Sequence, residues 1–261
     1  MNAAEKARIA REQAEKEEEI NKSKNEEKEA FERVKEQVQE ISTSKKWSTV
    51  KFGKYYKDAG KEPIEWLVLE NFGDEITLVS KYVLDCYDFY HDSERSYKQV
   101  ISWDISDIRE WLNHEFLDKA FSKNEQKFIM KKEIDSLRCG NGIYNSSFEN
   151  IDTTTDKVYL LSRMDLKRGK TLFGNKLKKC KPTKYALSKS VVGKNNCLWW
   201  LRDTEEICYV RGYIGYTGEY VYSGGPRKYI CVSNPGMRKF LSKEKRRRVG
   251  VRPVITLKIE D

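Results

Sequence analysis

The first forty residues have a pattern of charged and apolar positions that the rest of the chain lacks. Residues 4–41 contain no Pro or Gly and consist mainly of Ala, Glu, Lys, Arg and Gln, which favour helix. Apolar residues at heptad spacing occur late in this stretch, at Phe31, Val34, Val38 and Ile41. Before them only Ile20 fits the same repeat, so the seam is short for a coiled coil. The pattern predicts a charged helix that is solvated to about residue 28. Its last turns either dock on the body or allow self-association with another chain.

After Trp47 the pattern changes to short apolar runs separated by turns. These runs predict strands at 50–56, 64–70, 75–82, 157–162, 198–202, 207–210, 218–222 and 249–259. The turn 71–74 predicts a hairpin, and Ser106 and Ser122 are N-cap residues that predict helices at 106–113 and 125–132. The polar stretch 138–156 is interpreted as a long loop. Antiparallel strands with a few short helices and long loops predict an α+β domain over 44–261, behind a charged arm over 1–43.

Charge is unevenly distributed along the chain. The sequence carries a formal net charge of +9, although residues 1–43 hold nine basic and twelve acidic residues. The remaining, basic part would attract polyanions, although scattered surface lysines that keep a domain soluble give the same excess. No apolar run approaches the roughly 18 residues of a membrane span, and the amino terminus lacks the apolar segment of a secretory signal. We therefore expect a cytoplasmic protein with no membrane span.

The residue types that usually carry catalysis show no recognisable arrangement. The six cysteines, Cys86, Cys139, Cys180, Cys197, Cys208 and Cys231, form no C-x-x-C pair, and we expect most of them to be reduced thiols. The two histidines, His91 and His114, belong to no local catalytic signature. Phosphate-binding, dinucleotide-binding and calcium-binding motifs are absent. The sequence therefore predicts no cofactor, no metal and no catalytic residue, and it favours a binding module over an enzyme.

Aromatic residues and arginine concentrate in the C-terminal third. Trp199 and Trp200 are neighbours on a predicted strand, so we expect one of them in the core and the other exposed. Arg202 shares the face of Trp200, and tyrosines follow at Tyr209, Tyr213, Tyr216, Tyr220 and Tyr222. Aromatic rings beside arginine are typical of stacking platforms for sugar rings or bases. The alternative is that many of these tyrosines simply cover the sheet.

Two basic features near the C-terminus have alternative interpretations. The run 243–248 contains Lys245, Arg246, Arg247 and Arg248. These residues either contact the phosphates of a polyanion such as nucleic acid, or form a charged hairpin loop. Arg252 lies between strand residues, where we expect a buried or half-buried ion partner, with Asp107 or Glu110 as the carboxylate.

An ordered set of motifs resembles an uncharacterised bacterial family, known only as a domain of unknown function. These motifs are FGKY, IEWLVLE, W-D-x-S-D-I-R-E-W-L-N, VYLLS, C-x-P-T-x-Y-A, WWLR and GVRPVITL, and they span about residues 47–259. The Trp-rich strand followed by G-V-R-P resembles the end of C-type-lectin-like folds. Those folds include the formylglycine-generating enzymes and the variable receptors of diversity-generating retroelements.

This resemblance implies a C-type-lectin-like domain whose first and last strands pair in one antiparallel sheet, with a ligand surface on the loops between the last strands. The leading hypothesis is a non-catalytic module that binds a glycan or a protein through the Trp/Tyr/Arg-rich surface. One alternative is an enzyme related to the formylglycine-generating oxidoreductases that uses Cys197 or Cys208. The other is a polyanion-binding protein acting through 243–248.

Overall fold

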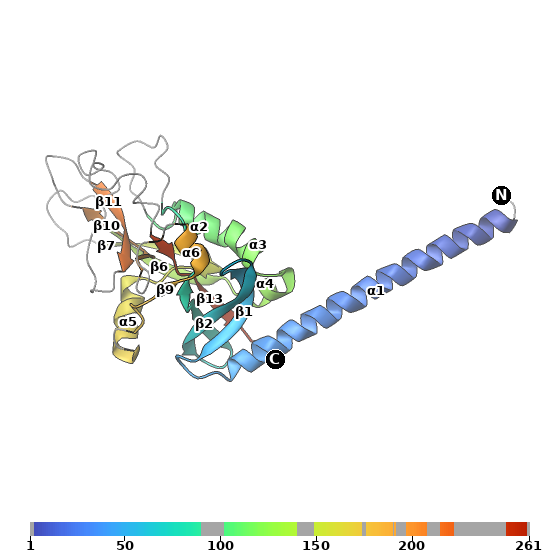
Figure 1. Cartoon of the computed structure of the whole chain (residues 1–261), viewed down its shortest axis with the longest axis horizontal. Helices are drawn as coiled ribbons and strands as arrows, with labels where there is room; N and C mark the ends of the chain where they lie inside the picture. Colours follow the sequence, from blue (N-terminus) through green and yellow to red (C-terminus); the bar gives the residue numbers. More distant parts are fainter. Residues whose placement is uncertain are drawn as a thin grey trace.

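A computed structural model of the chain has an α+β body from which one long helix projects (Figure 1). The structure describes residues 3–89, 102–139, 149–173, 176–189, 191, 197–207, 215–221 and 249–259. The projecting helix, α1 (Ala3–Ser42), agrees with the helix predicted over 4–41. No helix in these ranges combines the length and the apolar character that crossing a membrane requires.

The first sheet has the strand order β1-β2-β3-β13-β8. Its strands are β1 (Thr49–Tyr56), β2 (Lys61–Asn71), β3 (Glu75–Ser80), β13 (Val254–Lys258) and β8 (Val158–Tyr159). The predicted hairpin is confirmed as β2–β3, closed by a hydrogen bond from Phe72 N to Glu75 O of 3.0 Å. The first and last long strands share this sheet, as expected, but they do not pair with each other. The apolar strand β3 lies between β2 and β13 and uses both of its edges.

A glycine bulge brings β1 against a neighbouring helix. The β1–β2 register shifts between Lys51 and Lys54, and Gly53 in this bulge has φ +67°. A Cβ at this position would lie 2.5 Å from the Phe121 ring, so no other residue fits without displacing that ring. This close approach explains the glycine of the FGKY motif.

The second sheet has the order β5-β12-β10-β6-β7, and β11 also pairs with β10. Its strands are β5 (Asp85–Cys86), β12 (Gly250–Val251), β10 (Trp199–Ile207), β6 (Lys132–Cys139), β7 (Glu149–Asp156) and β11 (Gly215–Val221). The sheet is mixed, because β10 runs parallel to both β12 and β6. Two short strands, β4 (Tyr82–Val83) and β9 (Lys181–Pro182), form a third, parallel pair.

Of the stretch predicted as a long loop, 138–156, the described residues 138–139 and 149–156 are instead strand residues of a hairpin. β6 and β7 pair antiparallel from Lys132↔Asp156 to Cys139↔Glu149. The prediction was wrong because the sequence of β7, ENIDTTTD, is too polar to resemble that of a buried strand. Its β-branched threonines nevertheless favour extended backbone, and Thr154 and Asp156 are buried by polar contacts.

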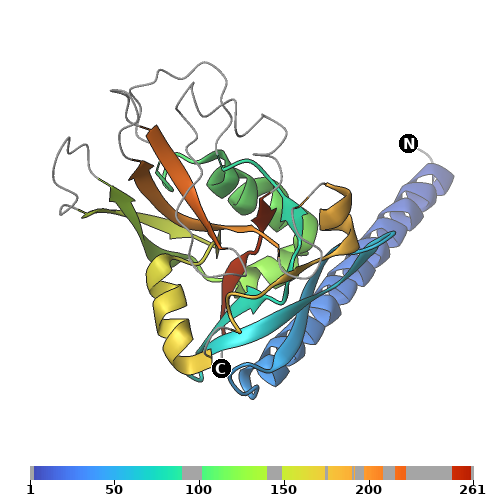
Figure 2. The same ribbon diagram turned by 60° about the vertical axis from the view of Figure 1, so that its left-hand side comes forward.

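Short helices pack between the two sheets and around them (Figure 2). They are α2 (Asp107–Trp111), the π-helical turn η1 (Leu112–Phe116), α3 (Leu117–Ala120), α4 (Lys123–Phe128), α5 (Arg163–Phe173) and α6 (Lys184–Ser188). Ser106 caps α2, and Ser122 forms the expected capping box with Glu125 at the start of α4. The helix predicted to reach residue 132 ends at Phe128, because Ile129 is extended and bridges to Leu257 of β13.

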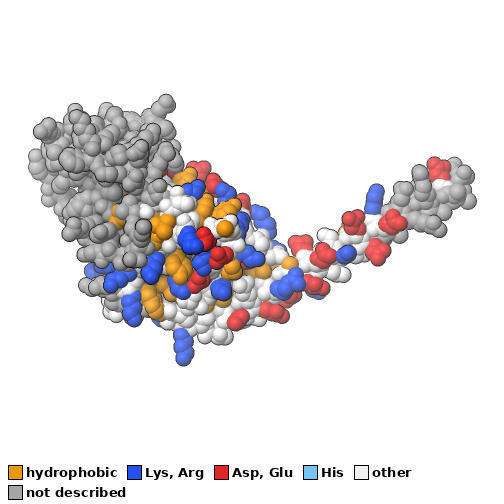
Figure 3. Space-filling model, viewed as in Figure 1, with side chains coloured by type: hydrophobic (Ala, Val, Ile, Leu, Met, Phe, Trp, Pro, Cys, Tyr) orange, Lys and Arg blue, Asp and Glu red, His pale blue; other side chains and the backbone are white. Residues whose placement is uncertain are grey.

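The apolar seam of α1 is used within its own chain. Val38 and Ile41 are buried, and the Phe31 ring stacks on Phe128 of α4 with centroids 5.3 Å apart. Through residue 29, each α1 side chain that the structure describes is exposed, and acidic and basic groups cover the projecting part (Figure 3). The last turns therefore dock on the body, and self-association through the projecting part stays a prediction.

Candidate functional site

The structure buries both tryptophans of the predicted platform. Trp199 is fully buried and Trp200 is 3% exposed, so the expectation that one of them faces solvent is wrong. β10 is central in its sheet, with strands paired on both sides, and other groups cover each face. The guanidinium carbon of Arg252 lies 4.9 Å from the centroid of the Trp199 ring. Trp200 Nε1 donates a hydrogen bond to Tyr87 O at 2.9 Å. In this structure the two rings anchor core elements.

The other members of that predicted surface are only partly described. Tyr209, Tyr213 and Tyr222 lie outside the described residues, as do Lys245, Arg246, Arg247 and Arg248. Tyr216 and Tyr220 belong to β11, but their side chains are outside the described part. His91 and Cys208 are also outside it. The roles proposed for these residues therefore stay predictions.

Arg202 is buried at the junction of β10, β6 and α5. Its Nε donates to Asp135 O at 2.7 Å, and its Nη1 donates to Leu160 O at 2.7 Å and to Asp165 Oδ2 at 2.6 Å. Asp165 also accepts from Ser162 N at 2.8 Å and so closes the first turn of α5. Arg202 therefore fixes the position of α5 against the hairpin β6–β7.

A cleft of about 380 Å³ opens beside this junction, between α5, the β6–β7 hairpin and the first sheet. We call it the α5 cleft. Its lining includes Arg202 and Asp165 and the rim residues Ile151, Met164, Arg168 and Leu172. Three of these rim residues are apolar and exposed: Ile151 is 61% exposed, Met164 47% and Leu172 55%. Among the described residues only Ile20 and Phe72 are comparable exposed large hydrophobics, so most of this class gathers at one cleft.

Carboxylates outnumber cations in the α5 cleft. The acidic lining residues are Glu70, Glu133, Asp135, Asp165 and Asp203, and the basic ones are Lys132, Arg168 and Arg202. Two of these cations already have a carboxylate partner in the chain, because Arg202 pairs with Asp165 and Lys132 pairs with Glu75 at 2.5 Å. The cleft is thus acidic in a chain whose net charge is +9.

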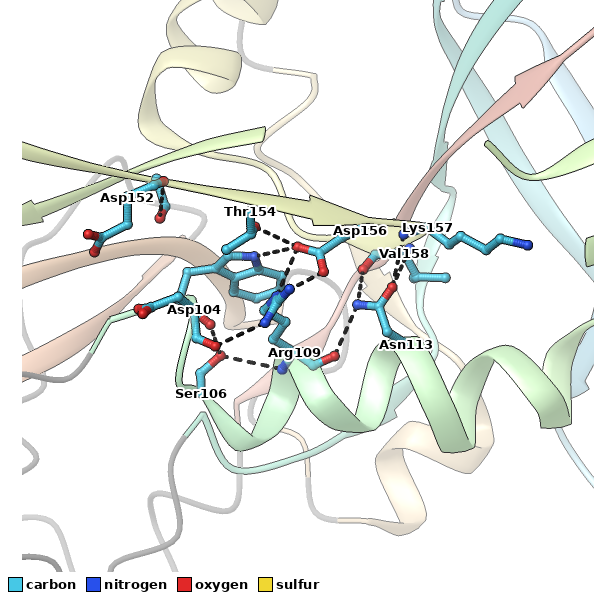
Figure 4. Close-up of polar contacts among 11 residues, drawn as sticks. Asp104, Ser106, Arg109, Asn113, Asp152, Thr154, Asp156, Lys157 and Val158 are labelled. Carbon is cyan, nitrogen blue, oxygen red and sulfur yellow. Dashed lines mark hydrogen bonds and ion pairs between the residues drawn. The ribbon is translucent and has the colours of Figure 1, made fainter. Parts of the chain in front are cut away.

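A second cavity, of about 590 Å³, lies over a network around Asp156 that we call the Asp156 cluster. The buried Asp156 carboxylate accepts from Trp103 Nε1 at 3.0 Å, Arg109 Nε at 2.8 Å and Thr154 Oγ1 at 2.7 Å (Figure 4). These donors come from the segment before α2, from α2 and from β7. The carboxylate already has three partners within the protein, which is typical of a structural anchor.

Asn113 and Lys157 extend this network. Asn113 Nδ2 donates to Val158 O at 2.9 Å, while Asn113 Oδ1 accepts from Lys157 N at 2.9 Å (Figure 4). Lys157 Nζ donates to Gln126 O at 2.6 Å. Partial burial, together with repulsion from Lys131 and Lys123, lowers the pKa of Lys157 below its ordinary value. Trp103, Arg109 and Asn113 all belong to the W-D-x-S-D-I-R-E-W-L-N motif. The motif therefore supplies the residues that anchor the hairpin.

A buried pair, Tyr55 and Asp85, links the first sheet to the second. Tyr55 Oη donates to Asp85 Oδ2 at 2.6 Å. Burial raises the pKa of Asp85, although the hydrogen bonds from Tyr55 and from Cys86 N oppose that rise. Burial and the neighbouring carboxylate also raise the pKa of Tyr55. Tyr55 also lines a small cavity of about 10 Å³ between β1 and β2, which has little more space than one water molecule needs, so we assign the pair to the scaffold.

The expected partner of Arg252 is wrong. Its Nε donates to Ser80 O at 2.9 Å and its Nη1 to Leu177 O at 2.5 Å, whereas Asp107 and Glu110 lie on α2. Pro253 O, next along the chain, accepts from Ser80 N at 2.9 Å, so this segment is held by backbone of the β3 end. Cys86, Cys180 and Cys197 form no disulfide, and in the described ranges no three metal-binding side chains converge.

Sequence reasoning missed the cleft rim and the Asp156 carboxylate. Met164, Arg168 and Leu172 recur every four residues, which places them along one side of a helix, but our interpretation of the sequence did not extend a helix over 163–173. Asp156 was counted as part of a loop. The four-residue spacing of the rim residues and the position of Asp156 are both visible in the sequence. Neither could be interpreted without knowing that 163–173 is helix and 149–156 is strand.

Comparison with known proteins identifies a family and no characterised relative. Residues 73–259 match the family described as Domain of unknown function (DUF6273). No curated protein matches the chain, and no solved structure matches it.

Proposed function

The chain belongs to the DUF6273 family, and from that premise we propose that it is a non-catalytic binding module that holds a protein segment in the α5 cleft. The observation that carries the proposal is the gathering of Ile151, Met164 and Leu172 on the rim of one cleft. Exposed apolar groups that cluster beside polar ones are typical of interaction sites. Arg202, a member of the surface expected from sequence, supports the cleft from beneath.

The lining favours a protein segment over a glycan. Sugar rings usually stack on an exposed aromatic face, and the aromatic ring among the described lining residues, Tyr159, is buried. Aliphatic rim residues fit the apolar side chains of a peptide instead. Because carboxylates exceed cations in the cleft, the segment that we propose carries Lys or Arg beside its apolar residues.

We also propose that the body has the C-type-lectin-like fold. Two features support this proposal: the first and last long strands share one sheet, and the WWLR and GVRP segments lie side by side as β10 and β12. Most of the loops that would carry a lectin-like ligand surface fall outside the described residues. The α5 cleft would then be a second face of such a domain.

The binding proposal is tested with a phage-displayed library of random peptides selected on the full-length protein. We expect the selected peptides to combine aliphatic and basic residues, and a labelled peptide to bind Leu172→Glu and Met164→Glu at least about tenfold more weakly than the wild type. The matched control is Ile20→Glu, because Ile20 is 53% exposed but lies on the projecting arm. Glu133→Lys should weaken binding and reduce its dependence on salt. Equal affinity of all four variants, or selection of no peptide, would contradict the proposal.

A further inference from the structure

Arg252 is a buried cation without a carboxylate partner among the described residues. Its side chain is 1% exposed, and its contacts are the carbonyls of Ser80 and Leu177 and the Trp199 ring. A buried charge is strongly unfavourable unless an opposite charge compensates it. Carbonyl dipoles and an aromatic ring contribute to this compensation but supply no negative charge. The negative charge that balances Arg252 must therefore come from another group near it.

Two thiols belong to the segments that Arg252 contacts: Cys180 follows Leu177 by three residues, and Cys197 precedes Trp199 by two. Cys180 precedes β9 and Cys197 precedes β10, and Cys197 N donates to Cys180 O at 2.9 Å. Cys197 Sγ lies 3.2 Å from the same carbonyl oxygen, and both side chains are almost fully buried. The two residues, 17 apart in sequence, thus meet at the boundary between the strands they precede.

The charges around Cys180 favour its thiolate. Burial alone would raise the pKa of Cys180, but a hydrogen bond from the Cys197 thiol and the Arg252 guanidinium lower it overall. The pKa of Cys197 is raised, first by its hydrogen bond to Cys180 and then by burial. The opposite directions of these two pKa shifts make Cys180 the thiol of the pair that loses its proton more readily.

We propose that Cys180 and Cys197 are a peroxide-sensitive thiol pair that closes to a disulfide, with Arg252 as the counter-cation of the reactive sulfur. The Cys180 thiolate attacks one oxygen of hydrogen peroxide, the O–O bond breaks, and the hydroxide that leaves takes up a proton to become water. The Cys197 sulfur then attacks the sulfenic sulfur, the S–O bond breaks and a second water leaves with the Cys197 proton. Two thiols are oxidised and one peroxide is reduced to two waters.

Closing this bond would tie together a segment that shapes the body. The residues between the two cysteines include β9 and α6. Within them, Thr183 N donates to Val83 O at 2.9 Å, and the Tyr185 ring stacks on Tyr56 with centroids 4.9 Å apart. A disulfide removes conformations of this segment from the unfolded chain and so stabilises the folded one. The burial of both sulfurs limits the reaction to a small oxidant, or to moments of local opening.

The test treats the full-length, reduced protein with hydrogen peroxide, then alkylates it under denaturing conditions and maps its peptides by mass. We expect a linked peptide pair joining Cys180 and Cys197, lighter by two hydrogens, and a melting temperature several degrees higher than that of the reduced protein. Cys86 is the internal control: it is half-buried, and burial first and then Asp85 raise its pKa to about 12, so it should stay alkylatable. Recovery of both Cys180 and Cys197 as free thiols, or of Cys180 as sulfinic acid without a link, would overturn the proposal.

Variants separate the roles of the three residues. Cys197→Ser should leave a sulfenic acid on Cys180, detectable with dimedone, whereas Cys180→Ser should leave Cys197 unreacted. Arg252→Lys keeps the charge and should form the Cys180–Cys197 disulfide at a rate close to that of the wild type. Arg252→Met should form this disulfide at least about tenfold more slowly. Circular dichroism checks that each variant folds. If Arg252→Met folds and links at the wild-type rate, the guanidinium is not the counter-cation and that part of the proposal fails.

Discussion

The Asp156 cluster and the α5 cleft both involve the hairpin β6–β7, yet they differ in what their side chains do. In the Asp156 cluster, polar groups point at one another, and the carboxylate has three donors from its own chain. In the α5 cleft, large apolar side chains on the rim point away from the core and contribute little to folding. The difference teaches that polar groups whose hydrogen bonds are all made within the chain belong to the scaffold here. Exposed apolar side chains that cluster on the surface indicate instead a place where a partner can bind.

Removing the carboxylate of the Asp156 cluster should have the largest effect on stability. Asp156→Ala leaves the Trp103 indole and the Arg109 guanidinium without their acceptor in a buried site, and we expect a loss of about 3–5 kcal/mol in the free energy of unfolding. Urea unfolding measures it. Thr155→Ala, at the exposed neighbouring position, should change that free energy by less than about 0.5 kcal/mol. If both substitutions have similar small effects, the cluster is not an anchor and the contrast with the cleft fails.

The pH dependence of stability sharpens the comparison, because Lys157 lines the cavity over the cluster. Its pKa is lowered by burial and then by Lys131 and Lys123, so the folded state binds its proton less tightly than the unfolded state does. The contribution of Lys157 to stability therefore rises as the pH increases from its folded pKa toward the unfolded value of about 10.5. Lys157→Met should remove this alkaline rise in unfolding free energy. If the pH dependence of the unfolding free energy is the same in that variant as in the wild type, folding does not disfavour the protonated form of Lys157.

The smallest effect on stability is expected at the cleft rim. Met164→Gln and Leu172→Gln replace side chains that are 47% and 55% exposed, so the free energy of unfolding should change by less than about 0.5 kcal/mol. Leu166→Gln is the matched control in the same helix, because Leu166 is 6% exposed and its loss should cost about 2–5 kcal/mol. Thermal unfolding of the three variants checks the order. A large loss at Met164 or Leu172 would make the rim part of the core.

Much of the fold could be predicted because its signals are local. The hairpin β2–β3, the N-caps of Ser106 and Ser122 and the long arm each depend on residues within a few positions of one another. The strand β7 was missed because its buried side chains are Thr154 and Asp156, whose burial depends on donors from the segment 103–109. The pattern of neighbouring residues in the sequence cannot show that a polar residue is buried, when its hydrogen-bond partners are far away in the chain.

The candidate site was less predictable for the same reason. Alternation correctly separated Trp199 from Trp200, but it says nothing about whether a further layer covers each face, and both rings are buried. Arg202 was selected as an exposed partner for a ligand and instead holds α5 through Asp165. The rim residues Met164 and Leu172 were not selected, because an exposed apolar side chain is recognisable only after its neighbours are known.

The sequence by itself determined the N-terminal helix, the α+β class, the N-caps of Ser106 and Ser122 and the hairpin β2–β3. Those features follow from backbone propensity and side-chain periodicity, which act over a few residues. Only the tertiary structure decided that Asp156 meets Trp103 and Arg109, that Arg252 lies between the carbonyls of Ser80 and Leu177, and that the α5 cleft has an apolar rim. These contacts join residues far apart in the chain, and burial is a property of everything packed around a side chain rather than of its neighbours in sequence.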